Sequence, residues 1–138
     1  MTVVVDSSVV VAALIDAGPV GVWAEALLVS GPLAAPHLMP VEVANILRRA
    51  ALAGDISADV ASLAHEDLVL LRVGLFPYSA CASRVWELRS NITAYDACYV
   101  ALAETLGARL ATLDTRLSRA AGTRCEFAVP PGYAGEAD

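Results

Sequence analysis

The hydrophobic side chains of this sequence fall into short continuous runs that alternate with longer stretches of helical spacing. Residues 2–5 read Thr-Val-Val-Val, and such a β-branched run is typical of a strand that is covered on both faces. Val43, Ile46 and Leu47 follow the spacing of an amphipathic helix. The first pattern predicts strands at residues 2–5, 33–35, 73–76, 109–112 and 125–129. The second, with capping residues or Pro at the starts and Gly at several ends, predicts helices at residues 9–15, 20–30, 40–53, 58–71, 78–89, 93–106 and 115–121.

Strands and helices alternate along the whole length, and this order predicts the fold class. Such alternation is typical of α/β proteins in which helices cover a parallel sheet. We therefore expect a three-layer α/β/α sandwich with a mainly parallel central sheet of about five short strands. No internal repeat or linker divides the chain, so residues 1–129 are expected to form one domain, with a tail of Pro, Gly and acidic residues at 130–138.

Composition excludes several classes of protein. Hydrophobic residues make up 57% of the 138 residues and charged residues 17%, a balance that excludes intrinsic disorder. The longest uncharged stretch, residues 26–41, contains Gly and Pro and is too short for a membrane span, and the N-terminus lacks the basic region of a signal peptide. Cys81, Cys98 and Cys125 are widely spaced, so we expect reduced thiols in a cytoplasmic protein. The apolar surplus favours a dimer or another partner.

The charged residues narrow the chemistry further. The net charge is −6 and all 9 basic residues are arginine, so binding of nucleic acid through net positive charge is disfavoured. Without lysine the chain cannot complete a P-loop or the acidic pocket of a receiver domain. It also lacks a nucleophile elbow, a glycine-rich dinucleotide motif after the first strand and the second aspartate of D-x-D phosphatases. An acidic, lysine-free site remains.

Four acidic residues are placed where parallel α/β sheets bind ligands. Asp6 follows the first predicted strand and Asp114 follows the fourth, so both belong to the carboxyl-terminal edge of the sheet. Glu42 and Asp96 lie in the first turns of predicted helices, which can begin at the same edge. We therefore expect these four carboxylates to converge.

Each acid taken singly also has an ordinary structural explanation. Asp6 and Asp114 can cap the helices that follow them. Thr93 with Asp96 matches the capping box, in which the carboxylate reaches back to the backbone of the first residue. Glu42 fits an ordinary solvated helix face. The argument for a site therefore depends on the four acids together.

Convergence of four carboxylates would change their chemistry. Two like charges about 4 Å apart repel by ~4 kcal/mol at an effective dielectric constant of about 20, and protonation or a bound cation must relieve this repulsion. Oxygen-only ligands suit Mg²⁺ or Mn²⁺. His37 and His65 have no His or Cys neighbour at zinc-ligand spacing, so zinc is not expected. The four acids therefore predict a magnesium or manganese site.

Four stretches of the sequence, in order, resemble the PIN-domain family. They are residues 3–14, 42–48, 93–103 and 110–114, and each contains one of the four acids. Order and spacing agree from residue 1 to about residue 128, and the size without an appended domain is similar to that of VapC-type toxins of bacterial toxin–antitoxin pairs. The match is most specific in the third stretch, Thr-Ala-Tyr-Asp-Ala-Cys-Tyr-Val-Ala-Leu-Ala.

The resemblance implies an endoribonuclease that hydrolyses RNA phosphodiester bonds with Mg²⁺ or Mn²⁺. It also implies a homodimer and a VapB-like antitoxin whose C-terminal segment covers the active site. Asp6 and Asp96 would be the principal metal ligands, and the other two acids would complete the site directly or through water. The metal-binding and catalytic residues expected on this basis are Asp6, Glu42, Asp96 and Asp114.

Further residues are expected around this site. Ser7 and Thr112 are candidate hydrogen-bond donors to the acids, although a helix cap and a strand-end hydroxyl are equally good explanations. Trp23 and Trp86 lie in apolar helices and are expected in the core or an interface, so no aromatic platform for RNA is identifiable. The candidates for phosphate contact near the rim are Arg48, Arg49, Arg84, Arg89 and Arg116.

Two other functions stay open at this point. The chain can be a non-catalytic PIN-like RNA-binding or scaffolding module whose acids serve folding, or a metal-dependent DNA nuclease. A scaffold would show no stabilisation by Mn²⁺, whereas a site that binds the ion stabilises the native state.

Overall fold

The computed structural model describes residues 1–133, so residues 134–138 of the predicted tail lie outside the described residues. The strands are β1 (Val3–Val5), β2 (Leu33–Pro36), β3 (Gly74–Phe76), β4 (Arg109–Ala111) and β5 (Phe127–Ala128). The helices are α1 (Ser7–Ile15), α2 (Pro19–Leu28), α3 (Met39–Leu52), α4 (Ala58–Leu70), the 3-10 turn η1 (Tyr78–Ala80), α5 (Ala82–Glu87), α6 (Ala94–Leu106) and α7 (Thr115–Ser118).

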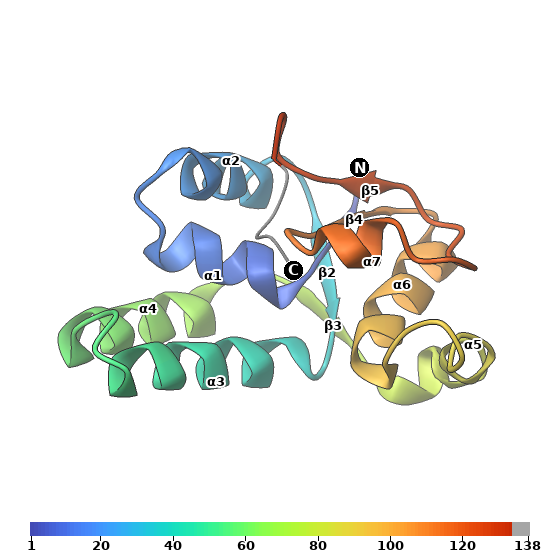
Figure 1. Cartoon of the computed structure of the whole chain (residues 1–138), viewed down its shortest axis with the longest axis horizontal. Coiled ribbons are helices and arrows are strands. Elements are labelled where there is room, and N and C mark those ends of the chain that lie inside the picture. The colour runs from blue at the N-terminus through green and yellow to red at the C-terminus, as the bar shows by residue number, and fades with distance from the viewer. Residues whose placement is uncertain (134–138) are drawn as a thin grey trace.

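The sheet is entirely parallel, in the strand order β3-β2-β1-β4-β5 (Figure 1). Val4 of β1 pairs with Ala34 of β2 on one side and with Leu110 of β4 on the other. The chain thus extends the sheet from β1 first in one direction and later in the other. Parallel α/β proteins bind ligands at such a switch point, outside the carboxyl ends of the strands, which here are β1 and β4.

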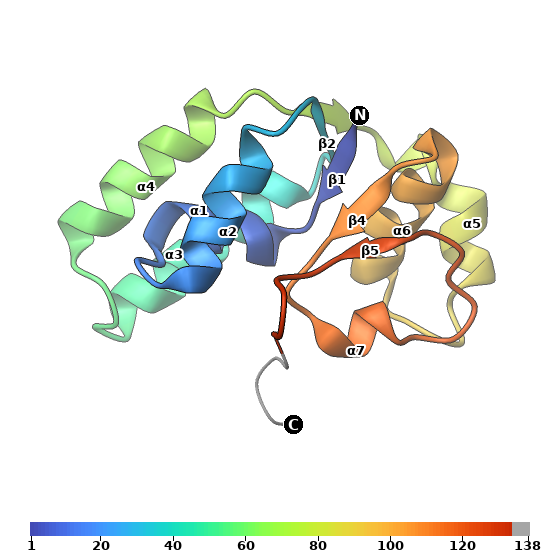
Figure 2. The ribbon, with the colours of Figure 1, turned by 90° about the horizontal axis from the view of Figure 1, so that it is seen from above.

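Helices cover both faces of this sheet. Figure 2 shows α1, α2, α3 and α4 together on one side of the sheet and α5 with α6 on the other. α1 contacts α2, α3 and α4, whereas α6 packs directly on β1, β2 and β4. The predicted three-layer α/β/α sandwich with five short parallel strands is therefore confirmed.

α6 lies against the sheet, and its sequence explains its limits. Residues 97–103 are all buried, as expected for a helix that is enclosed on several sides. Thr93 begins the helix, because its hydroxyl accepts the backbone N–H of Asp96 at 3.2 Å. Gly107 ends it with a φ of 61°, a left-handed conformation that glycine adopts without strain. Because a short turn then leads into β4, the first turn of α6 lies at the carboxyl-terminal edge of the sheet.

Three predicted elements differ most from the structure in extent. The predicted helix 78–89 is divided into η1 and α5, because Cys81 leaves the helical conformation with a φ of −122°. The predicted helix 115–121 ends at Ser118. The predicted strand 125–129 shortens because only two of its residues find partners on β4. These limits depend on neighbouring elements and not on local pattern.

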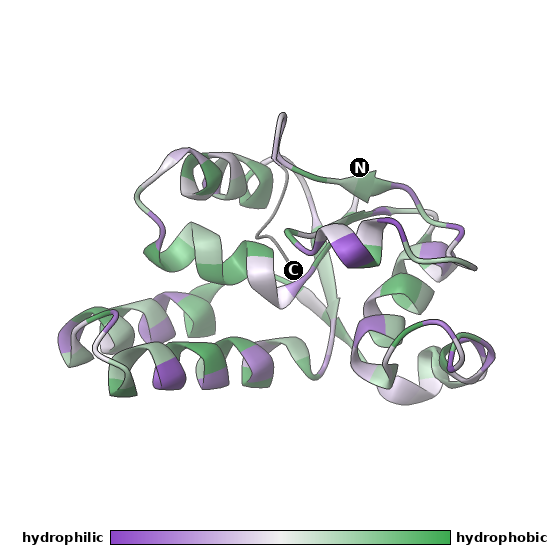
Figure 3. Ribbon diagram, in the orientation of Figure 1, coloured by the Kyte–Doolittle hydropathy of each residue, from purple (hydrophilic) through white to green (hydrophobic). Residues whose placement is uncertain are grey.

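α1 and α2 form an apolar pair, and α1 is mostly green in Figure 3. The two helices are bent by 113° relative to each other. Gly21 permits this close turn, because a Cβ at that position would collide with the backbone carbonyl of Asp16. Among the described residues no single helix is long and apolar enough to cross a membrane, and this bent pair meets that criterion only by combined length and composition.

Candidate active site

Asp6 is a buried carboxylate at the end of β1, with 7% of its surface exposed. It precedes α1, yet its side chain makes no capping hydrogen bond to that helix. Three hydroxyl groups donate to this carboxylate instead. Thr112 at 2.8 Å and Ser8 at 3.0 Å donate to Oδ2, and Ser7 at 3.3 Å donates to Oδ1. Burial raises the pKa of Asp6, and the bonds from Thr112 and Ser8 offset part of this rise. Asp6 therefore occupies the N-cap position of α1 without capping it through its side chain, and both predicted donors contact the carboxylate.

The same hydroxyls connect Asp6 to the loop after β4. Thr112 Oγ1 also accepts the backbone N–H of Asp114 at 3.0 Å, and Ser8 Oγ accepts that of Leu113 at 3.1 Å. Two hydroxyl bridges therefore join the ends of β1 and β4 at the switch point. The sequence analysis did not identify Ser8, although the Asp-Ser-Ser run was an available signal.

Asp96 lies half-buried in the first turn of α6. The hydroxyl of Thr93 caps this helix, but among the described residues no hydrogen bond runs from the backbone of Thr93 to the Asp96 carboxylate, so only half of the capping box forms. Burial raises the pKa of Asp96, and the charges of Asp6 and Asp114 raise it further. A hydrogen bond from the Thr93 side chain offsets part of this rise, so the Asp96 carboxylate interacts both with the other acids and with the start of its own helix.

Glu42, in the first turn of α3, is held by a residue that the sequence analysis did not single out. The buried hydroxyl of Tyr99 on α6 donates a short hydrogen bond to Glu42 Oε1. Burial raises the pKa of Glu42, Tyr99 offsets part of the rise, and the charges of Asp6 and Asp96 add to it. The solvated-face explanation is therefore wrong for Glu42. Tyr99 follows Asp96 by one helical turn, and this spacing was the signal in the sequence.

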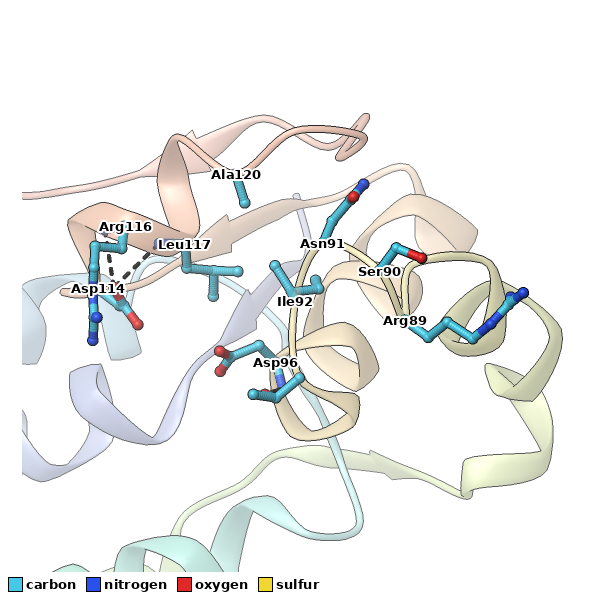
Figure 4. A pocket seen from close by; sticks show the side chains of 10 residues that line it. Arg89, Ser90, Asn91, Ile92, Asp96, Asp114, Arg116, Leu117 and Ala120 are labelled. Carbon is cyan, nitrogen blue, oxygen red and sulfur yellow. Dashed lines mark hydrogen bonds between the residues drawn. The ribbon is translucent and has the colours of Figure 1, made fainter.

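Asp114 borders a cavity of about 640 Å³ between α7 and the segment that leads into α6. Its Oδ1 accepts the backbone N–H groups of Arg116 at 3.0 Å and Leu117 at 3.1 Å, so the helix-cap explanation is correct for this oxygen. Figure 4 shows the carboxylates of Asp114 and Asp96 facing each other across the cavity. Asp114 thus caps α7 and faces the acidic site at the same time.

The four acids form a row of electrostatic neighbours and not a closed ligand cage. Glu42 interacts with Asp6 and Asp96, and Asp96 interacts with Asp6 and Asp114. Within residues 1–133, no three Asp, Glu, His or Cys side chains are already grouped closely enough to hold a metal ion. These acids fit Mg²⁺ or Mn²⁺, because all their donor atoms are carboxylate oxygens. Burial disfavours the negative charge of these carboxylates unless a cation offsets it.

The arginines expected near the rim have different environments. The guanidinium of Arg84 donates to Glu104 at 2.7 Å. Because Glu104 lies near the end of α6, this ion pair is at the edge of the sheet away from Asp96, and the expectation that Arg84 contacts phosphate is wrong. The other four arginines are exposed. Arg48 and Arg49 lie on α3, and Arg89 and Arg116 lie beside the cavity.

Replacing Thr112 by valine tests the bridge between β1 and β4. The substitution removes a donor to Asp6 and an acceptor of the Asp114 N–H at a fully buried position. We expect the free energy of unfolding, measured by urea denaturation, to fall by about 2 kcal/mol. The control is Thr105→Val at an exposed position, because the Thr105 hydroxyl donates to the carbonyl of Ala101 within its own helix. Equal effects of the two substitutions would contradict a special role for Thr112.

Comparisons with known proteins agree with this fold. The family described as PIN domain matches residues 3–123. Ribonuclease VapC9 of Mycobacterium tuberculosis is 39% identical over 129 residues, which cover 94% of this chain and 98% of the relative. Ribonuclease VapC1 of the same organism is 42% identical over 125 residues, which cover 90% of this chain and 94% of the relative. The solved structure of VapBC2 from Rickettsia felis, bound to a DNA fragment from their promoter, has the same fold, with a TM-score of 0.66, 17% identity and coverage of 94% of this chain and 98% of that chain.

Proposed function

This chain belongs to the PIN-domain family, and we propose that it is a VapC-type endoribonuclease, the toxin of a VapBC-type toxin–antitoxin pair. Kinship with VapC9 and VapC1 over nearly the whole length supports ribonuclease chemistry. One structural observation carries the proposal: acids from β1, α3, α6 and the β4–α7 loop interact at the switch point of the sheet. These are the acids of the family-like stretches, namely Asp6, Glu42, Asp96 and Asp114.

We propose Mg²⁺ or Mn²⁺ as the cofactor. Asp6 and Asp96 would be the principal ligands, and Glu42 and Asp114 would complete the site directly or through water. When bound, such an ion supplies an activated water molecule and positive charge against the negative charge that develops on the phosphate. Support for this comes from the all-oxygen donor set and from the raised pKa values of three of the acids.

The residues around the acids hold them in position. The hydroxyls of Ser8 and Thr112 fix Asp6 Oδ2, and Tyr99 fixes Glu42 Oε1. Tyr99 keeps its proton and remains a donor, because burial and this bond raise its pKa. Asp114 is fixed through Oδ1 by the start of α7. Acids that are oriented in this way lose little freedom on binding an ion and the substrate phosphate.

RNA binding in this enzyme would depend on local and not on net charge. The chain as a whole carries a charge of −6, but Arg89 and Arg116 flank the cavity that Asp96 and Asp114 border. The substrate we propose is an unpaired segment of RNA, because the major groove of duplex RNA is too narrow for side chains to read.

We propose a VapB-like antitoxin as the partner, with its C-terminal segment over the site, and a homodimer in the cytoplasm. The Rickettsia structure is that of a VapBC pair, which supports the first partner. Exposed large apolar side chains on α3 and α4 support protein contacts by these two helices. They include Val41, Leu52, Leu63, Val69 and Leu70. The three free cysteines fit a reducing compartment.

Brief induction of the chain in a bacterial host, followed by sequencing of RNA 5′ ends, tests this function. We expect new 5′ ends at unpaired sites, and none after induction of the Asp96→Asn variant. Co-expression of a small protein encoded beside the chain should suppress the cuts and raise the yield of the chain. An unchanged 5′-end profile would contradict the ribonuclease, and cuts that persist with the neighbour present would contradict the antitoxin.

A further inference from the structure

Trp86 and Arg89 form an ordered pair on the surface at the end of α5. Trp86 is 65% exposed, which is unusual for tryptophan. The guanidinium carbon of Arg89 lies 4.8 Å from the centroid of the Trp86 ring. Arg89 Nη1 also donates to the backbone carbonyl of Trp86 at 2.7 Å. The sequence analysis expected this tryptophan in the core or an interface, and its exposure excludes the core.

Arg89 connects this pair to the acidic site. It borders the same cavity as Asp96 and Asp114. Figure 4 shows Arg89 at the end of the cavity away from Asp114, with its guanidinium pointing outward. A single strand whose phosphate lies at the acids and that leaves the cavity at Arg89 would come within reach of Trp86, because Arg89 contacts that ring.

One positive charge on this path can attract a polyanion. Glu87, the acidic neighbour of Trp86, shares Arg84 with Glu104, at 3.2 Å and 2.7 Å, so the negative charge of Glu87 is only partly offset. Arg89 is exposed and bonds only to a neutral carbonyl among the described residues, so its positive charge is not offset by a carboxylate. A flat ring next to a guanidinium stacks with any base and attracts the adjacent phosphate.

We infer that Trp86 and Arg89 form a stacking platform for an unpaired base of the RNA strand that extends from the acidic cavity. This inference rests on the proposed function, because it takes RNA as the substrate of the same site. The platform adds affinity for single strands without selecting a sequence, since every base has a flat face. It acts on binding and has no part in bond cleavage.

Binding of a fluorescein-labelled, unstructured RNA of about 10 nucleotides tests the platform. All variants carry Asp96→Asn so that the probe stays intact, and affinity is measured by fluorescence anisotropy. We expect Trp86→Ala to weaken binding about 10-fold and Trp86→Phe to retain most of the affinity. Arg89→Gln should weaken binding and lower the slope of affinity against salt by about one, whereas Trp86→Ala should leave that slope unchanged.

Tyr95 provides the matched control, because it is exposed to a similar extent, 67%, and lies beside Asp96 on α6. Tyr95→Ala should leave affinity within about twofold of the parent. Loss of affinity in Tyr95→Ala but not in Trp86→Ala would overturn the inference. So would a Trp86→Ala variant that binds RNA normally but changes from dimer to monomer, since Trp86 would then belong to a contact between copies of the chain.

The outcome for the platform can be separated from the outcome for the proposed function. Failure of the parent chain to cleave RNA, with Trp86→Ala still reducing affinity, would contradict the nuclease and leave the platform in place. In the opposite case, cleavage by the parent with an equal KM for a Trp86→Ala variant that retains Asp96 would leave the nuclease in place and overturn the platform.

Discussion

Asp96→Asn should reduce metal-dependent RNA cleavage by about 1,000-fold. The substitution keeps the size of the side chain and removes the negative charge of an acid that interacts with Asp6 and faces Asp114 across the cavity. If Asp96 is a principal ligand as proposed, its loss would weaken binding of the ion that would activate the attacking water. The measurement is kcat/KM on a single-stranded oligoribonucleotide in Mg²⁺ and in Mn²⁺. Asp67→Asn, at an exposed acid on α4, is the matched control and should retain full activity.

The same variant should remain folded. Burial, together with the charges of Asp6 and Asp114, raises the pKa of Asp96, so its charged form destabilises the native state. A neutral asparagine should therefore unfold at the same or a higher temperature. Normal turnover in the folded variant would exclude Asp96 from the mechanism, and a melting temperature several degrees lower would mean that the loss of activity reflects the fold.

Mn²⁺ is expected to stabilise the chain strongly at neutral pH. An ion that binds only the native state contributes about 3 kcal/mol at 100 times its dissociation constant. For a chain of this size the melting temperature should rise by about 10 °C. The measurement is thermal unfolding with increasing MnCl₂. The Asp6→Asn and Asp96→Asn variants should show little of this shift, whereas Asp67→Asn should show all of it.

The effect of pH in the absence of Mn²⁺ has the opposite sign to that of an ordinary salt bridge. Burial raises the pKa values of Asp6, Glu42 and Asp96 above their usual values of 3.8 for Asp and 4.5 for Glu. Between the usual and the raised values the native chain binds more protons than the unfolded chain, so stability falls as pH rises. The stability that the protonated acids contribute is fully present below the usual pKa values. It is lost as the pH rises through the raised pKa values.

Mn²⁺ should reverse this trend, because the ion binds the deprotonated acids. The stabilisation by Mn²⁺ should therefore increase as pH rises. A melting temperature that does not respond to Mn²⁺ at any pH, in a chain that still binds RNA, would indicate a PIN-like RNA-binding or scaffolding module. In such a module the acids serve folding alone, and Asp96→Asn would leave RNA binding unchanged.

Much of the fold could be predicted because its signals are local. The β-branched run at residues 3–5 and the Gly107 stop are properties of single segments. The position of Asp6 and Asp114 at one edge follows from the parallel order of the strands, and the structure places both there. The ends of α5, α7 and β5 could not be predicted, because they depend on which partners the neighbouring elements leave available.

The contacts that hold the acids were harder to predict. Tyr99 on α6 meets Glu42 on α3, 57 residues earlier in the sequence, and no local pattern indicates which residue its hydroxyl contacts. Arg84 was expected near phosphate because all arginines share the same charge, but its ion pair with Glu104 becomes visible only once α5 packs on α6. Trp86 lies between Val85 and Glu87, a local pattern that fits a buried or an exposed ring, so only the packed structure shows that the ring is exposed.

The hydroxyl bridges between β1 and β4 have a consequence for synthesis of the chain. Asp6 is among the first residues to leave the ribosome, but its donor Thr112 is 106 residues later. Until β4 has emerged and paired with β1, Asp6 lacks both that donor and the neighbouring Asp114. The central strand β1 then has no strand paired on its β4 side. A nascent chain thus carries an incomplete set of acids while its message is still being translated, and the set is completed only when β4 pairs with β1.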